Sequence, residues 1–205
     1  MSDVINATLL AEAFVTLFVI MDPPGTIPIF LSLTRGRSAK TIRRAAWQAV
    51  AVSFGVISVF AFFGQGILHY LHISLPALQC AGGLLLLLVA LELLTGKESE
   101  PNVVAETNIA LVPLGTPLLA GPGAIVATMV FSKEVENWAT FGAVALGVVG
   151  VHLAIWLAMR YSLPILRLIR ASGVLLVTRI AGLLLSAIAV QLIADSVRAF
   201  IAGEG

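Results

Sequence analysis

Six apolar runs, each long enough to cross a bilayer as a helix, dominate this chain of 205 residues. A helix needs about 20 apolar residues to span the ~30 Å of hydrocarbon. Only 11% of the residues are charged, against about 25% in soluble domains. The runs are continuous, whereas barrel strands alternate in polarity. They therefore predict an all-α polytopic membrane protein, with spans at Thr8–Leu33, Ala45–Tyr70, Leu75–Leu94, Ile109–Phe131, Trp138–Tyr161 and Arg179–Ile201.

The basic residues between these runs predict the orientation. In a six-span chain nearly all of them fall on one side, in the connections after the first, third and fifth spans. Only Lys133 and Arg198 fall on the other side. Because positively charged loops stay in the cytoplasm, both termini are expected outside. The formal net charge of +1 gives no indication of a nucleic-acid partner.

Two pairs of segments repeat at nearly the same separation. Gln79–Leu93 resembles Thr178–Leu192 at an offset of 99 residues, with Gly83 opposite Gly182. Pro23–Ile27 resembles Gly121–Ile125 at an offset of 98. An odd number of spans in each half makes the second copy enter from the opposite side. The sequence therefore predicts one transmembrane domain, residues 1–205, built of inverted three-helix repeats at about 8–95 and 109–201.

Two of the six runs are interrupted near their centres. The first contains Asp22–Pro23–Pro24–Gly25, and the fourth contains Gly121–Pro122–Gly123. Proline removes a backbone donor and glycine adds conformational freedom, so both helices are expected to break and restart. Irregular backbone survives in a membrane only where protein or a wet cavity covers it. We therefore expect the broken first and fourth helices to meet at the midplane.

The breaks have the polarity of a zwitterion site. A restarted helix presents free N–H groups that favour a carboxylate, while the preceding half-helix presents carbonyls to a cation. The Asp22 carboxylate can pair with an ammonium group, carry a proton or ligate sodium. The neighbouring side chains are small or apolar, which suits a short neutral ligand. The predicted binding residues are Asp22, Pro23, Pro24, Gly25, Thr26, Thr116, Gly121, Pro122, Gly123 and Ala124.

Two further polar residues lie within the predicted spans. Glu92 either extends toward the nearby loop or contributes to an ion path. His152 either shuttles protons or makes packing hydrogen bonds. No nucleophile elbow, zinc-protease helix or P-loop occurs, so we expect no enzymatic activity and no ATP hydrolysis. No metal site and no cofactor is expected, apart from a coupling proton or sodium ion.

The motifs MDPPGTIPIFLSLT (Met21–Thr34) and PLGTPLLAGPGAI (Pro113–Ile125) resemble those of the MarC family of bacterial and archaeal six-span membrane proteins. That family is grouped with the neutral amino acid transporter family that includes SnatA. The resemblance covers nearly the whole chain. It implies a location in the bacterial or archaeal cytoplasmic (inner) membrane and secondary transport of small neutral amino acids, with a site at Asp22–Thr26 and Gly121–Gly123.

The sequence thus predicts a secondary transporter of small neutral solutes such as glycine, alanine and serine. Alternating access, coupled to protons or sodium, is the expected mechanism. One alternative is an exporter or channel for another small solute that uses the same breaks. Another is a non-transporting structural or regulatory membrane protein. The expected partners are a small solute and the lipid bilayer, and the oligomeric state stays open.

Overall fold

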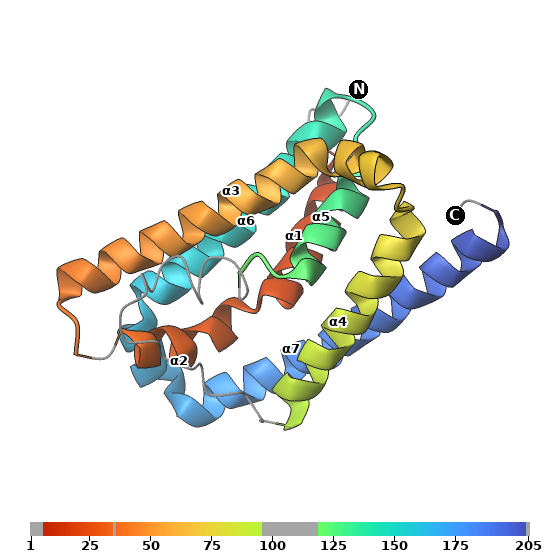
Figure 1. Cartoon of the computed structure of the whole chain (residues 1–205). Helices are drawn as coiled ribbons and strands as arrows, with labels where there is room; N and C mark the ends of the chain where they lie inside the picture. The colour runs from red at the N-terminus through yellow and green to blue at the C-terminus, as the bar shows by residue number, and fades with distance from the viewer. Residues whose placement is uncertain (1–5, 35, 96–118, 204–205) are drawn as a thin grey trace.

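The computed structural model describes residues 6–34, 36–95 and 119–203. Within these ranges every regular element is a helix (Figure 1). The prediction of an all-α membrane protein is confirmed. The seven helices are α1 (Ala7–Met21), α2 (Pro23–Leu33), α3 (Ala39–Leu71), α4 (Leu75–Thr95), α5 (Pro122–Lys133), α6 (Trp138–Arg160) and α7 (Ser162–Ile201).

Among the residues that the structure describes, five helical segments are long and apolar enough to cross a membrane: Ala7–Leu31, Ala39–Leu71, Leu75–Thr95, Trp138–Arg160 and Ser172–Ile201. They match five of the predicted spans. The predicted fourth span, Ile109–Phe131, is described only from residue 119, where α5 supplies 12 helical residues. The first of its two halves, including Thr116, lies outside the described residues, so the sixth span stays a prediction.

Polar side chains begin three of the helices. Asn6, Ser38 and Asn137 each accept a hydrogen bond from a backbone amide in the first turn of α1, α3 and α6. Asn137 also forms a capping box with Thr140. Each cap satisfies amides that have no partner within the helix, which fixes the starting residue.

The sequence placed the start of the last span too late, at Arg179. In the structure α7 begins at Ser162 and bends at Arg170, whose φ of 61° and ψ of 163° are not helical. The apolar span then runs from Ser172. Arg179 is exposed, so its long side chain can carry the charge away while its backbone continues the helix. A single arginine therefore does not mark the end of a span.

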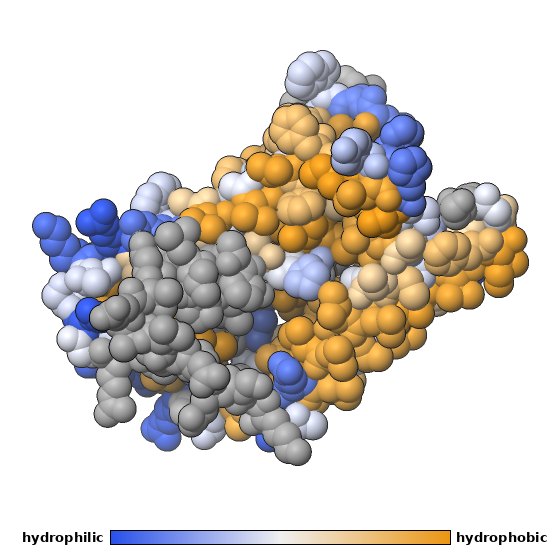
Figure 2. Space-filling model, viewed as in Figure 1, coloured by the Kyte–Doolittle hydropathy of each residue, from blue (hydrophilic) through white to orange (hydrophobic). Residues whose placement is uncertain are grey.

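The connections gather at two ends of the bundle. Figure 1 shows the N-terminus, the α3–α4 turn and the α5–α6 connection at the upper right, and the α2–α3 and α6–α7 connections at the lower left. Basic residues of the predicted cytoplasmic loops lie near this end: Arg37 in the α2–α3 connection, Arg160 at the end of α6 and Arg167 in the first part of α7. A hydrophobic surface runs between the ends, and hydrophilic side chains gather where α3 begins (Figure 2).

Helices α4 and α7 pack against each other through small residues. A methyl carbon added to Gly83 would lie 2.9 Å from the carbonyl oxygen of Ala189, and one added to Gly182 would lie 3.3 Å from that of Ala90. The two contacts exchange places under a shift of 99 residues. Close approach of backbones at glycine is the usual packing mode of membrane helices.

The shorter helices on either side of the breaks have matching neighbours. Helix α2 contacts α6 and α7, whereas α5 contacts α3 and α4. Helix α1 packs on α6 and also contacts α5. The segments that the sequence predicted to be broken thus lie inside the bundle, covered by the longer helices.

Replacing Gly83 by alanine is expected to lower the melting temperature, because the added methyl meets the α7 backbone and the helices must separate. Overpacking of this kind costs about 1–3 kcal/mol. Gly55→Ala is the matched control, since no atom lies within 4 Å of that added carbon. Scanning fluorimetry in detergent should give a lower Tm for Gly83→Ala only. Equal melting temperatures would contradict the close α4–α7 contact.

Candidate functional site

The first break is a single residue. Asp22 has φ 39° and ψ 69°, a left-handed conformation that ends α1, and α2 begins at the next residue, Pro23. The Asp22 N–H donates to the Phe18 carbonyl, and the Asp22 carbonyl accepts from the Thr26 N–H, both at 3.1 Å. Asp22 is only 8% exposed. The chain therefore turns sharply inside the bundle while both peptide groups of Asp22 stay bonded.

The two prolines leave carbonyl groups without their helical donors. In a continuous helix, the carbonyls of Val19 and Ile20 would accept from the amides of residues 23 and 24. Both of those residues are proline, which has no N–H. Val19 and Ile20 thus present carbonyl oxygens at the C-terminal end of α1, where the helix dipole favours a cation.

The Asp22 side chain lies over the first turn of α2. A methyl carbon added to Gly25 would overlap the Asp22 carboxylate and lie 3.3 Å from the Thr178 hydroxyl of α7. Glycine at position 25 therefore leaves the space in which the carboxylate and the hydroxyl approach one another. Thr178 is 3% exposed, so this polar group is buried with Asp22.

Thr178 is a site residue that the sequence reasoning missed. A signal was present, because Thr178 begins the second copy of the repeated segment and stands opposite Gln79. A polar residue at the same place in both copies points toward the interior of the bundle. Thr26, which was predicted, is also buried, and its hydroxyl donates to the Pro23 carbonyl at 2.7 Å.

The predicted second break is described only from residue 119, where the structure shows the start of a helix. Helix α5 begins at Pro122, as the sequence predicted, and Gly121 occupies the N-cap position without any side-chain cap. The amides of Gly123 and Ala124 follow in the first turn, and both residues are buried. Uncapped first-turn amides and the helix dipole together favour an anionic group.

Residues beside the two predicted breaks belong to the large buried core of the bundle, and Ala124 is the predicted site residue among them. Met21, directly before the first break, lies in one buried cluster with Leu119, Ala120 and Ala124, which flank the second. A methyl added to Gly123 would overlap the Leu86 side chain of α4, so a larger residue there would require Leu86 to shift. Pro23 is also buried, whereas Pro24 and Gly121 are half-buried and Pro122 is exposed. Thr116 lies outside the described residues.

His152 is buried on α6 and packs away from the breaks, against α3. Its Nδ1 lies 2.7 Å from the Val148 carbonyl, so this nitrogen carries the proton and donates it. Its Nε2 lies 3.2 Å from the Ser53 hydroxyl, which then donates to it. The ring of Phe54 packs edge-on at 5.2 Å. With both ring nitrogens bonded, the surroundings of His152 match the packing alternative.

Glu92 is exposed on α4, and Gln191, its repeat counterpart, is exposed on α7. The Gln191 amide donates to both carboxylate oxygens of Asp195 at 2.9 Å. Both alternatives for Glu92, extension toward the nearby loop and a part in an ion path, stay predictions.

Comparisons with known proteins support the resemblance seen in the motifs. The sequence model described as "MarC family integral membrane protein" matches residues 7–201. A UPF0056 membrane protein of Methanocaldococcus jannaschii is 36% identical over 196 residues, covering 91% of this chain and 94% of that one. The UPF0056 membrane protein YvbG of Bacillus subtilis is 31% identical over 193 residues, covering 90% and 92%. No solved structure matches the chain.

Replacing Ser53 by alanine should lower stability, because the buried Nε2 of His152 loses its donor. An unsatisfied buried polar atom costs about 1–3 kcal/mol. Ser58→Ala, one helical turn further along α3, is the control and should change stability by less than about 0.5 kcal/mol. Thermal unfolding in detergent compares the two. If both variants unfold at the wild-type temperature, the Ser53–His152 bond does not stabilise the α3–α6 contact.

Proposed function

The chain belongs to the MarC family of integral membrane proteins, and from this membership we propose that it is a secondary transporter of small neutral solutes. The proposed substrates are small neutral amino acids such as glycine, alanine and serine. The observation that carries this proposal is the buried break at Asp22, which places a carboxylate and proline-freed carbonyls inside an apolar helix. Ionisable groups at such positions are functional by default.

The two breaks favour ligand groups of opposite charge. An ammonium group would lie near Asp22 and the carbonyls of Val19 and Ile20, at the C-terminal end of α1. A carboxylate would lie at the start of α5, near the amides of Gly123 and Ala124. The contacts of α1 with α5 support one site between the two breaks. Its small neighbours leave room for a short neutral side chain.

The contacts between helices support the inverted repeats and the six-span arrangement of this proposal. If two repeats are related by a two-fold axis, a contact between two residues implies a second contact between their counterparts in the other repeat. Gly83 with Ala189 and Gly182 with Ala90 form such a pair at the predicted offset. The packing of α2 on α6 and α7 is likewise the counterpart of the packing of α5 on α4 and α3.

Alternating access would follow from one repeat rocking against the other around the two breaks. We assign coupling to a proton or sodium ion to Asp22 alone, because Glu92 is exposed and both nitrogens of His152 are bonded. The positively charged connections would face the cytoplasm, with both termini outside.

A non-transporting structural role is the main competing function. The Asp22 carboxylate lies over the first turn of α2, where a negative charge also stabilises the helix without any ligand. An exporter or channel for another solute would use the same groups with a different substrate. Binding of amino acids separates the transporter from the structural role, and a panel of substrates separates it from the exporter.

Asp22→Asn is expected to raise the Kd for alanine about thirtyfold or more while the protein stays folded. Losing the charge partner of a buried ammonium costs about 2–5 kcal/mol. Asp195→Asn is the control, because Asp195 forms an exposed ion pair with Arg198 and should leave binding unchanged. Titration calorimetry with and without sodium measures both variants. Wild-type affinity in Asp22→Asn would remove Asp22 from the mechanism.

A further inference from the structure

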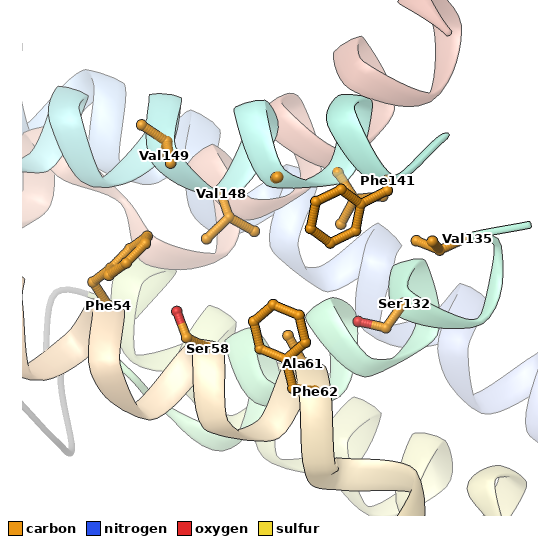
Figure 3. A pocket seen from close by; sticks show the side chains of 11 residues that line it. Phe54, Ser58, Ala61, Phe62, Ser132, Val135, Phe141, Val148 and Val149 are labelled. Carbon is orange, nitrogen blue, oxygen red and sulfur yellow. The ribbon is translucent and has the colours of Figure 1, made fainter. Parts of the chain in front are cut away.

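An apolar groove runs between α3 and α6, on a face that the proposed transport site does not use. Two adjoining hollows, of about 320 and 420 Å³, share Phe54 and Val149. Phe62 and Phe141 line the first hollow, and Trp47 and Trp156 line the second. Figure 3 shows the first hollow, with Phe54, Phe62 and Phe141 around it. We call the two hollows the α3–α6 groove.

The groove is long enough for an acyl chain. From Trp47 to Phe62 the α3 axis extends by about 22 Å, at 1.5 Å per residue. Half of the hydrocarbon core of a bilayer is roughly 15 Å thick. The polar atoms of His152, which borders the groove, are bonded to Val148 and Ser53. Ser58 and Ser132 also line the groove, and the Ser132 hydroxyl donates to the Thr128 carbonyl at 2.8 Å. The remaining lining side chains are apolar.

Cations surround one end of the groove. Lys40 and Arg43 precede Trp47 by seven and four residues, so they lie on the same face of α3. Arg160 follows Trp156 by four residues on α6. Lys40 and Arg43 are exposed, and the Arg160 guanidinium carbon lies 5.7 Å from the Tyr161 ring centroid.

Neither helix supplies a compensating negative charge. The sequences of α3 and α6 contain no aspartate or glutamate. Tryptophan side chains beside the cations, here Trp47 and Trp156, are typical of the level of the lipid headgroups. Basic groups between membrane helices on the cytoplasmic side are a known means of binding anionic headgroups.

We propose that the α3–α6 groove binds an anionic phospholipid, with one acyl chain between the helices and the phosphate held by Lys40, Arg43 and Arg160. A second copy of this chain fits the groove less well. In the same membrane orientation it would bring its own cations to the same end, where the like charges repel. A zwitterionic lipid would fill the groove but gain less from the three cations.

Tryptophan quenching tests the proposal. In a Trp138→Phe background, which removes the tryptophan at the far end of α6, the remaining fluorescence comes from Trp47 and Trp156. The protein is placed in phosphatidylcholine vesicles with a small fraction of lipid brominated on its acyl chains. Brominated phosphatidylglycerol should quench with an apparent affinity at least fivefold higher than that of brominated phosphatidylcholine. Equal quenching by the two lipids would overturn the proposal.

Charge variants locate the headgroup. Removing one cation should lower the preference for phosphatidylglycerol about fivefold, so Arg43→Gln with Arg160→Gln should nearly abolish it. Arg43→Lys with Arg160→Lys should keep it, as should the control Arg198→Gln at the other end. A preference that survives the double glutamine variant contradicts the site. A second copy would occupy the groove instead if two results came together. Both lipids would quench weakly, and a Trp47→Cys variant would form cross-linked dimers.

Discussion

Two prolines in the middle of a membrane-spanning helix impose the constraint on which the rest of this structure depends. Pro23 and Pro24 cannot donate to the carbonyls of Val19 and Ile20, and in lipid each lost bond costs several kcal/mol. Such a break must be covered by protein or wetted by a cavity. Helices α5, α6 and α7 surround it, and Asp22 is almost fully buried there.

The same constraint applies to the second half of the chain, where α5 is covered by α3 and α4. In the proposed inverted repeats, each broken helix packs against the two longer helices of the opposite half. Helices α4 and α7 can pack so closely because glycine replaces a side chain at Gly83 and Gly182. In the proposed mechanism, the two halves would tilt against each other at such contacts to give alternating access.

Much of the fold could be predicted from the sequence. Five spans, the start of a helix at Pro122 and the close-packing role of Gly83 and Gly182 all followed from apolar length, proline chemistry and repetition. The start of the last span could not, because Arg179 suggested a boundary, whereas α7 continues through it with the side chain exposed. The helix propensity of a residue does not predict the direction in which its long side chain points.

The site was less predictable, since its contacts join distant parts of the chain. Nothing near Asp22 in sequence indicates Thr178, and nothing near His152 indicates Ser53. Yet Ser53 and His152 are 99 residues apart, the same separation as Gly83 and Gly182. Equivalent positions of two repeats can meet on the two-fold axis that relates the repeats. The offset of 99 residues found in the sequence therefore also relates Ser53 to His152.

Counterflow of labelled alanine into proteoliposomes tests the central claim most directly. Vesicles preloaded with unlabelled alanine should accumulate the label transiently, and preloading with glycine or serine should support the same exchange. Vesicles preloaded with a large charged amino acid should not. If labelled alanine enters no faster than it enters protein-free vesicles, under proton or sodium gradients of either direction, the chain is not a transporter of neutral amino acids.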